Sequence, residues 1–538
     1  MNGSNSLIAG PADWDSLRSS FEWPSPDRFN IAHEVCDKWA EASPERVALI
    51  HPRDNLPAKH YSFGELSRLS GKLSSVLENS GFGKGDRLAV LLPQVPETVL
   101  AHLATSKRGG IVVPLFTLFG EDGLRFRLQN SGAKVIVTDS ANLPKILNIA
   151  ADLPDLEDVF CIDGSTGARD FWGALLAHRT DTVVASTKLE TPALLVYTSG
   201  TTGPPKGALH GHQVLLGHLP GVETHHEFFP QDGDLMWTPA DWAWMGGLMD
   251  ALLPSLYHGV PVLTHRLARF NAREAYALMI EYGVRNAFLP PTALKMLKQE
   301  PVPEGLSLRS VGSGGEALGA DLLTWGEEAL GLTINEFYGS TECNLVLGNC
   351  ASVMAPRPGS TGRAVPGKDV AVLDADGAVL PAGEVGEIAV KRGDPAMFLE
   401  YWGQPEKTAS KFSGDWLRMG DEGYVDADGF FFFSSRTDDV ITSSGYRIGP
   451  GEIEECLTGH PDVAMAGAIG VPDPERGEVV KAFVVMSKGA SFAGLEDLLI
   501  ARVRERISPH VAPRSIVEIA ELPMTATGKI MRRDLREL

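Results

Sequence analysis

Short apolar runs alternate with amphipathic stretches along most of the 538-residue chain. The runs at residues 87–92, 111–116 and 134–139 have the length and apolar character of buried strands. Between the first two runs, residues 97–109 have the spacing of a helix that ends at a glycine. Because apolar strands alternate with amphipathic helices, the pattern predicts an α/β fold built from layers.

A second series of elements follows the polar turn at residues 434–445. The pattern predicts a short helix at 451–457, strands at 463–471 and 479–486, a helix near 498–507 and a strand near Ile516. Together these elements form an α+β segment of about a hundred residues, a common size for one domain. One continuous fold with a surface loop at this turn is the alternative interpretation.

The composition excludes two classes of partner. Lysine and arginine number 48 against 69 aspartates and glutamates, which gives a formal net charge of −21. Such an acidic chain lacks the cations that attract nucleic acid or an anionic membrane surface. The content of 43% apolar and 22% charged residues is that of an ordinary globular protein. Small ligands are not excluded, since they respond to local charge only.

The five cysteines are widely spaced and form no CxxC pair, so they predict neither a disulfide framework nor a metal cluster. No run reaches the ~18 apolar residues that a membrane span needs, and residues 1–16 do not resemble a secretory signal. We therefore expect a cytoplasmic protein with no membrane span and no nucleic-acid partner. The oligomeric state stays open, with a homodimer as one option.

The strongest chemical motif is Tyr197–Gly207, with the sequence YTSGTTGPPKG. It follows the apolar run 193–196, where a strand passes into a loop. Its three glycines let a ligand approach the backbone, its four Ser and Thr hydroxyls offer hydrogen bonds, and Lys206 adds a positive charge, which together suit a polyphosphate. No GxxxxGK[ST] spacing occurs, so the motif is not a Walker loop. His210 and His212, which follow it, lack the spacing of metal ligands.

Six segments in a fixed order resemble the adenylate-forming superfamily, which includes acyl-CoA synthetases, nonribosomal peptide synthetase adenylation domains and beetle luciferases. The segments are TSGTTGPPKG at 198–207, GGEA at 314–317, EFYGSTE at 336–342, GDEGY at 420–424 with RTDD at 436–439, GYRI at 445–448 with EIE at 452–454, and TGK at 527–529. One departure is Ser435, where relatives usually carry glycine. The resemblance covers nearly the whole chain and is closest to acetyl- and medium-chain acyl-CoA synthetases.

The resemblance implies an enzyme that activates a carboxylic acid with ATP. Both reactants are anions, so the site must neutralise charge before they meet. Nucleotide binding is implied for Thr198, Ser199, Gly200, Thr201, Thr202, Gly203, Lys206, Gly315, Glu316, Ala317, Glu336, Tyr338 and Asp421. Catalytic roles are implied for Thr341, Arg436, Arg447 and Lys529, and Glu342 is the expected Mg²⁺ ligand. Each residue alone would have an ordinary structural explanation, and only the joint order of motifs favours the functional one.

The resemblance also predicts two domains with a hinge at Asp438. The large N-terminal domain, residues 1–437, would consist of layered α/β subdomains and bind ATP and the acid. The small α+β C-terminal domain, residues 438–538, would be mobile, delivering Lys529 for adenylation and withdrawing it for thioester formation. Gly445 would then line the path of the CoA thiol.

The acid and the thiol are expected beside the tract DWAWMGG at 241–247. By resemblance, Trp244 lies at the CoA-side gate, with Met245 and Gly246 beside the acyl group. Gly339 occupies a position at which acetate-specific relatives carry a tryptophan, so we expect open space there and a preference for acids longer than acetate. Trp242 is equally compatible with ordinary core packing, and the pair His225–His226 is expected at the surface.

The sequence thus predicts an AMP-forming acyl-CoA synthetase, an acid–thiol ligase of fatty acid metabolism. It would convert a short-to-medium-chain acid and ATP to acyl-AMP and pyrophosphate, and then use CoA to give acyl-CoA and AMP. The expected partners are the acid, ATP, Mg²⁺ and coenzyme A. CoA is the favoured acceptor because we expect no attached carrier or reductase domain after Lys529 and because the general layout resembles acyl-CoA synthetases. A stand-alone adenylation enzyme that loads a carrier protein is the alternative. A nucleotide-binding sensor without catalytic activity is the third hypothesis.

Overall fold

The computed structural model describes most of the chain. The described residues are 6–8, 10, 12–164, 166–178, 183–198, 205–267, 269–436, 439, 441–443, 446–473, 476–507, 511–524 and 530–538, with only the backbone at 436, 442, 446, 447, 452 and 477. The chain divides into two compact units. The first unit comprises Met1–Asp369 and Val390–Asp415, and the second unit comprises Val370–Ala389 and Trp416–Leu538.

An eight-stranded sheet in the first unit has the order β19-β9-β8-β4-β3-β5-β6-β7. Its strands are β3 (Arg87–Leu91), β4 (Ile111–Pro114), β5 (Val135–Thr138), β6 (Asp158–Cys161), β7 (Arg169–Asp170), β8 (Pro192–Thr198), β9 (Lys206–Gly211) and β19 (Glu400–Tyr401). The strands predicted at 87–92, 111–116 and 134–139 are confirmed as β3, β4 and β5. Their runs are apolar throughout because both faces are covered: Leu88 and Val90 belong to one hydrophobic cluster, Ala89 and Leu91 to another.

A second set of strands in the first unit has the order β16-β15-β14-β13-β12-β10-β11-β1-β2. These strands are β1 (Val47–Arg53), β2 (Leu56–Ser62), β10 (Met236–Trp237), β11 (Val262–Leu263), β12 (Asn286–Phe288), β13 (Ser310–Gly314), β14 (Ile334–Tyr338), β15 (Leu347–Gly348) and β16 (Gly362–Ala364). From β14 through β13, β12, β10 and β11 to β1 the neighbours run parallel. The short strand β20 (Phe412–Ser413) also belongs to this unit.

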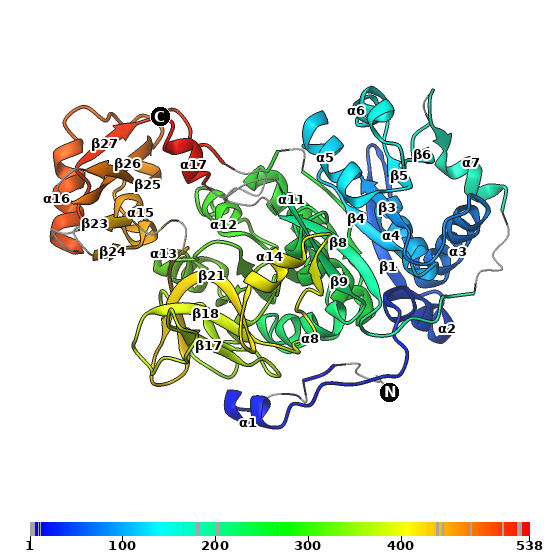
Figure 1. The fold of residues 1–538 in the computed structure, drawn as a ribbon, viewed down its shortest axis with the longest axis horizontal. Coiled ribbons are helices and arrows are strands. Elements are labelled where there is room, and N and C mark those ends of the chain that lie inside the picture. The colour runs from blue at the N-terminus through cyan, green and yellow to red at the C-terminus, as the bar shows by residue number, and fades with distance from the viewer. Residues whose placement is uncertain are drawn as a thin grey trace. The chain divides into compact units, whose positions relative to one another are not determined.

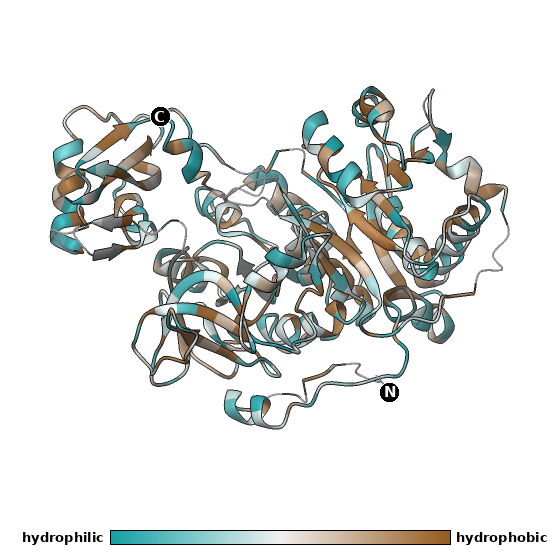
Figure 2. Ribbon diagram, in the orientation of Figure 1, coloured by the Kyte–Doolittle hydropathy of each residue, from teal (hydrophilic) through white to brown (hydrophobic). Residues whose placement is uncertain are grey.

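Helices pack on these sheets, and Figure 1 shows α3, α4, α5 and α6 beside the strands β3 to β5. The helices are α1 (Trp14–Ser19), α2 (Lys38–Ala42), α3 (Phe63–Asn79), α4 (Pro96–Lys107), α5 (Glu121–Ser131), α6 (Leu143–Ile149), α7 (Phe171–Leu176), α8 (Val214–His225), α9 (Met245–Gly247), α10 (Leu253–Tyr257), α11 (Ala272–Tyr282), α12 (Pro291–Lys298), α13 (Ala320–Trp325) and α14 (Pro405–Ser410). Shorter helical segments are η1 (His33–Asp37), η2 (Ala150–Asp152), η3 (Leu248–Leu252) and η4 (Gly326–Leu330). Figure 2 shows hydrophobic residues concentrated on the central strands.

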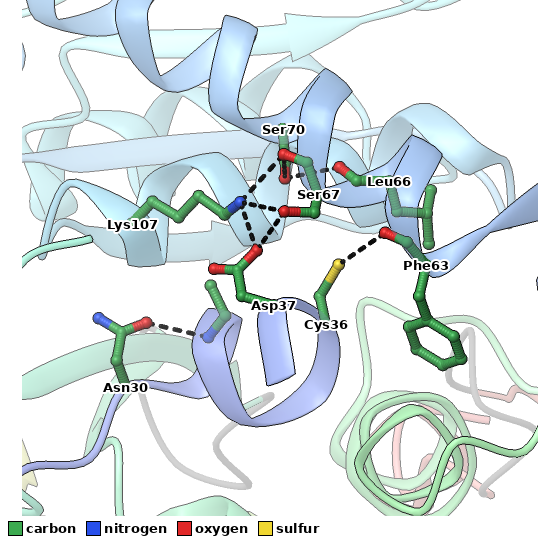
Figure 3. Close-up of polar contacts among 9 residues, drawn as sticks. Asn30, Cys36, Asp37, Phe63, Leu66, Ser67, Ser70 and Lys107 are labelled. Atoms are coloured by element: carbon green, nitrogen blue, oxygen red, sulfur yellow. Dashed lines mark hydrogen bonds and ion pairs between the residues drawn. The ribbon is translucent and has the colours of Figure 1, made fainter. Parts of the chain in front are cut away.

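A buried ion pair joins three elements at the N-terminal end of the first unit (Figure 3). Lys107, at the end of α4, donates to the Asp37 carboxylate at 2.7 Å and to the Ser67 carbonyl on α3 at 3.1 Å. The Ser67 hydroxyl donates to the same Asp37 oxygen at 2.6 Å. Asp37 ends η1, so these contacts fix η1 against α3 and α4. The side chains of Lys107 and Asp37 are 4% and 10% exposed.

The second unit contains two sets of strands. The first set has the order β17-β18-β21-β22, with β17 (Val370–Leu373), β18 (Gly386–Lys391), β21 (Trp416–Val425) and β22 (Phe430–Arg436). The second set has the order β24-β23-β26-β25, with β27 beside β26. The strands of this second set and the helices of the same stretch of chain are β23 (Ile441–Ser443), β24 (Tyr446–Ile448), α15 (Pro450–Thr458), β25 (Val463–Asp473), β26 (Gly477–Met486), α16 (Glu496–Arg506), β27 (Ser515–Glu518) and α17 (Arg532–Leu535).

Every element predicted after residue 445 is present in the second unit. The predicted helices are α15 and α16, and the predicted strands are β25, β26 and β27. The α/β fold class is therefore confirmed, while the boundary between residues 437 and 438 stays a prediction. Within the part of the chain that the structure describes, no helix is both long enough and apolar enough to cross a membrane.

Candidate active site

The candidate phosphate loop connects two antiparallel strands of the first unit. Thr198, at the end of β8, pairs with Lys206, at the start of β9, and the Thr198 hydroxyl donates to the Lys206 carbonyl at 3.5 Å. The two ends of the loop are therefore held at one position in the sheet. The predicted phosphate-binding residues between them, Ser199, Gly200, Thr201, Thr202 and Gly203, lie outside the described residues.

The GGEA segment at 314–317 and the EFYGSTE segment at 336–342 leave the sheet together. Strands β13 and β14 are parallel, and Gly314 lies opposite Phe337. Because parallel strands present their carboxyl ends at one edge, Gly315–Ala317 and Tyr338–Glu342 emerge side by side, where ligands of α/β sheets bind. Gly315 and Ala317 are exposed, whereas Tyr338, Thr341 and Glu342 are half-buried. The structure thus brings together two segments that the sequence analysis treated separately.

Two of the predicted nucleotide-binding carboxylates accept hydrogen bonds within the first unit. Glu336 is buried, and its carboxylate accepts from the Leu318 backbone N–H at 3.2 Å. Glu316 is half-buried and accepts from the Thr292 hydroxyl at 3.0 and 3.1 Å. Glu336 therefore joins β14 to the segment after Ala317, and Thr292 orients Glu316 at the exposed edge.

The segment Met397–Trp402 connects the phosphate loop to the YGSTE turn. The Phe398 N–H donates to the Glu342 carbonyl at 2.7 Å, and the Trp402 N–H donates to the Gly207 carbonyl at 2.8 Å. Between these two contacts, the Tyr401 hydroxyl donates to the Glu342 carboxylate, and the Lys206 ammonium lies 5.2 Å from the Tyr401 ring centroid. One tyrosine therefore contacts both the cation of the phosphate loop and the expected metal ligand.

The surroundings of Glu342 keep its carboxylate ionised. Burial raises the pKa of Glu342, but the Lys411 charge and the hydrogen bonds from Tyr401, from its own backbone and from Ser340 together outweigh burial, so the pKa falls below its ordinary value. His210 on β9 is buried next to Thr341 and Glu342, and burial lowers the pKa of His210 to about 4 although both neighbours favour the charged imidazole. His210 is therefore neutral at pH 7 and adds no cation that would compete at Glu342.

The residues around Glu342 suit Mg²⁺. The described residues contain no group of three or more His, Cys, Asp or Glu side chains arranged to hold a metal ion by themselves. Mg²⁺ ordinarily takes one or two protein carboxylates and completes its coordination with substrate phosphates and water. A single ionised carboxylate close to a phosphate-binding loop fits that mode, so Glu342 is the residue that would hold the ion.

The predicted CoA-side gate is part of an aromatic group. Trp244 is half-buried, with its ring centroid 5.7 Å from Phe116 and 6.5 Å from Phe119. Trp242 is 2% exposed and belongs to the core, as expected for ordinary packing. Met245 begins the short helix α9 and is also buried. This aromatic group is therefore built by two segments that lie far apart in the sequence.

Asp241 stabilises the turn that carries Trp244. Its Oδ1 accepts from the Ala243 N–H at 2.9 Å, and its Oδ2 lies 3.9 Å from Arg266. Burial raises the pKa of Asp241 from 3.8 to about 6, although the Ala243 N–H and Arg266 favour the charged form. Below pH 3.8 the carboxyl is neutral in both the folded and the unfolded chain. The unfolded chain ionises above pH 3.8 but the folded chain only near pH 6, so stability is lost as the pH rises from about 4 to about 6 and stays at the lower level above that.

We expect Asp241→Asn to stabilise the protein, and to do so more at pH 8 than at pH 5. The amide keeps the Oδ1 acceptor and removes the buried charge, so the gain should reach about 2–3 kcal/mol at pH 8 and be about 1 kcal/mol smaller at pH 5. Urea unfolding followed by tryptophan fluorescence measures both values. The matched change at the exposed Asp376 should have little effect at either pH. An equal gain for Asp241→Asn at both pH values would contradict the buried-charge explanation.

The expectation of open space at Gly339 is wrong. A Cβ atom at this position would lie 2.3 Å from the Leu345 backbone nitrogen and 2.6 Å from the Asn344 side-chain oxygen. The chain turns back onto Gly339, so glycine is needed there for close backbone approach. Gly246 is similarly confined, since a Cβ atom would lie 2.8 Å from the Phe288 ring. A tryptophan at position 339 would therefore disturb the turn before it could report on pocket length.

The predicted site residues of the second unit are only partly described. Asp421 on β21 is buried and pairs with Arg436 on β22, so the backbones of these two predicted site residues lie opposite each other on neighbouring strands. Arg447 on β24 pairs with Thr442 on β23. Nothing is described of the Arg436 and Arg447 side chains. Asp438, Gly445 and Lys529 lie outside the described residues.

Two residues that the sequence analysis missed hold parts of these motifs in place. Tyr401 contacts Glu342, as described above. Arg532, close to the TGK motif, donates to Asp439 at 3.0 Å and to both Glu454 oxygens at 2.8 Å. The position of Arg532 close to the TGK motif is the sequence signal that could have found it, whereas no signal in the sequence around Tyr401 indicates its role.

Comparison with known proteins identifies the family. The AMP-binding enzyme family matches residues 36–402, and the AMP-binding enzyme C-terminal domain matches residues 452–529. The acyl-coenzyme A synthetase ACSM3, mitochondrial, of Mus musculus is 34% identical over 98% of this chain and 93% of its own length. The acetyl-coenzyme A synthetase of Bacillus subtilis is 33% identical over 97% of this chain and 93% of its own length.

A solved structure agrees with these matches. The anthranilate CoA ligase AuaEII, in complex with anthranoyl-AMP, has a TM-score of 0.87 and 28% identity, covering 95% of this chain and 97% of that chain. The family matches span the phosphate loop, the YGSTE turn and the C-terminal lysine motif. The chain therefore belongs to the AMP-binding, adenylate-forming family, as an AMP-forming acyl-CoA synthetase.

Proposed function

We propose that this chain couples two half-reactions in one site. A carboxylic acid attacks the α-phosphorus of ATP to give acyl-AMP and pyrophosphate, and the CoA thiol then attacks the acyl carbon to give acyl-CoA and AMP. The observation that carries the proposal is that Lys206 and Glu342 both contact Tyr401, the ammonium at its ring and the carboxylate at its hydroxyl. A cation and an ionised carboxylate, held at the ends of two loops, supply what a magnesium-bound polyphosphate needs.

The chain's own residues have separate tasks in this scheme. Lys206 and the loop that begins at Thr198 bind the β- and γ-phosphates, while Tyr338 packs on the adenine and Asp421 accepts from the ribose hydroxyls. Thr341 contacts the α-phosphate, and Lys529 bridges that phosphate and the acid as charge moves between them. Mg²⁺, held by Glu342, would neutralise phosphate charge. Because these groups are preorganised, the two anions meet without reorganisation of water.

The C-terminal domain and the gate serve the second half-reaction. We place its hinge at Asp438 and its boundary between residues 437 and 438. Arg447 supports the adenylation pose, and Gly445 and Trp244 line the path of the thiol. Arg436 lies beside Asp421 in the paired strands and supports the ribose contact.

The acid is proposed as short- to medium-chain and longer than acetate. The support is the resemblance of the ordered motifs to acetyl- and medium-chain acyl-CoA synthetases, because the confined turn at Gly339 offers no argument for a longer pocket. Overall identity does not discriminate, since relatives at similar identity are named for acetate and for anthranilate. A pocket separates acids that differ by one methylene by only ~1–3 kcal/mol, so we propose a range of acids. Their use in fatty acid metabolism and the cytoplasmic location stay predictions.

The decisive experiment measures pyrophosphate release with linear C2–C12, branched and aromatic acids, with and without CoA. We expect acid-dependent release that is strongest above C2, together with thioester and AMP when CoA is present. Release without any thioester would instead favour an enzyme that loads a carrier protein. Binding of ATP with no release for any acid would favour a nucleotide sensor and overturn the proposal.

A further inference from the structure

Tyr401 is fixed from several sides before it reaches the site. It lies on β19, pairs with Ala208 on β9, and its side chain is 1% exposed. Its backbone N–H donates to the Thr408 hydroxyl on α14 at 2.9 Å. Its ring packs edge-on against Phe398, with centroids 4.9 Å apart. Its position is therefore set by the surrounding structure.

The segment that carries Tyr401 has its own buried anchor. Lys368 and Asp394, at 0% and 3% side-chain exposure, form an ion pair of 2.6 Å. The same Asp394 oxygen accepts from the Ala396 N–H at 2.8 Å. Two residues later the Phe398 N–H donates to the Glu342 carbonyl. The backbone of Glu342 and the ring of Tyr401 are thus tied to one rigid stretch of chain.

Packing alone does not explain why the side chain at position 401 carries a hydroxyl. A phenylalanine would fill the same volume, and a buried hydroxyl costs free energy unless it is hydrogen-bonded. Here the hydroxyl donates to the one carboxylate in the YGSTE turn. A donor to an ionised carboxylate fixes its orientation and favours the charged form. Residues that hold a metal ligand in this way commonly change metal affinity 10–100-fold when they are replaced.

We infer that Tyr401 is a positioning residue for the nucleotide–metal complex: its hydroxyl orients the Glu342 carboxylate for the cation, and its ring packs against the Lys206 ammonium at the start of β9. The inference rests on the proposed function, because it takes Glu342 as the metal ligand. The two parts of the side chain are separable. Tyr401→Phe removes only the hydroxyl, whereas Tyr401→Leu removes the hydroxyl and the ring.

The test measures binding in the full-length protein, independently of turnover. Mn²⁺ binding in the presence of a non-hydrolysable ATP analogue is followed by electron paramagnetic resonance, and binding of the analogue alone is measured in EDTA. Tyr401→Phe should weaken Mn²⁺ binding ~10–100-fold and leave metal-free nucleotide binding unchanged. Tyr401→Leu should weaken both. Tyr276→Phe, which removes another buried hydroxyl that donates to the Leu297 carbonyl at 3.2 Å, should change neither.

A comparison with Glu342→Gln separates positioning from a general loss of structure. If Tyr401 acts through Glu342, the double variant Tyr401→Phe/Glu342→Gln should bind Mn²⁺ no more weakly than Glu342→Gln alone. Additive losses, or unchanged Mn²⁺ binding by Tyr401→Phe while Glu342→Gln weakens it, would overturn the inference and leave the proposed function standing. Failure of the wild-type protein to bind Mn²⁺ with the nucleotide would overturn the proposed function itself.

Discussion

Lys529→Ala is expected to slow adenylate formation by ~10²–10³-fold and to leave thioester formation from a supplied acyl adenylate near its original rate. In the first half-reaction two anions approach each other, so a placed ammonium stabilises the charge that develops between them. In the second half-reaction the adenylate already exists, and its acyl carbon is attacked by a thiol. The lysine would then no longer be needed, which is the reason for the proposed hinge that would withdraw it.

The two half-reactions are measured separately, pyrophosphate release for the first and AMP release from synthetic acyl adenylate plus CoA for the second. Lys488→Ala is the matched control, because it removes an exposed lysine from the same part of the chain. It should leave both rates unchanged. Equal loss of both half-reactions in Lys529→Ala would contradict the assignment of the hinge and of this lysine.

The layered fold is predictable because its strands are covered on both faces. In β3, Leu88 and Ala89 belong to different hydrophobic clusters, so neither face tolerates a polar residue and the strand becomes an uninterrupted apolar run. The candidate phosphate loop is recognisable in the sequence for a different reason. Phosphate chemistry requires particular residue types close together in sequence, as in the run from Thr198 to Lys206.

Contacts between distant segments could not be predicted. Tyr401 reaches Glu342 only because β19 pairs with β9, and no local pattern around residue 401 indicates that pairing. The surface position expected for His225 and His226 is wrong for a similar reason, since both are fully buried. His225 stacks on Phe337 at 4.5 Å, and His226 contacts the Ser310 hydroxyl at 2.8 Å. Two adjacent histidines indicate a polar surface position as long as their partners on β13 and β14 are unknown.

The buried pair of Figure 3 leads to the largest expected effect on stability. Lys107→Met should destabilise the first unit by about 3–5 kcal/mol, because the Asp37 carboxylate remains buried after its cation is lost. The Ser67 hydroxyl still donates to Asp37 at 2.6 Å but brings no charge. Urea unfolding followed by tryptophan fluorescence measures the loss.

The double variant Lys107→Met/Asp37→Leu should recover most of the lost stability, since an apolar pair of similar volume needs no desolvation of charge. Lys298→Met is the surface control: its partner Asp321 is 81% exposed, so its removal should cost less than about 1 kcal/mol. A double variant as unstable as Lys107→Met would mean that the specific hydrogen bonds of Asp37, rather than its unpaired charge, hold η1 against α3 and α4. Recovery in the double variant would show that the pair is replaceable, and that the cost lies in leaving one charge alone.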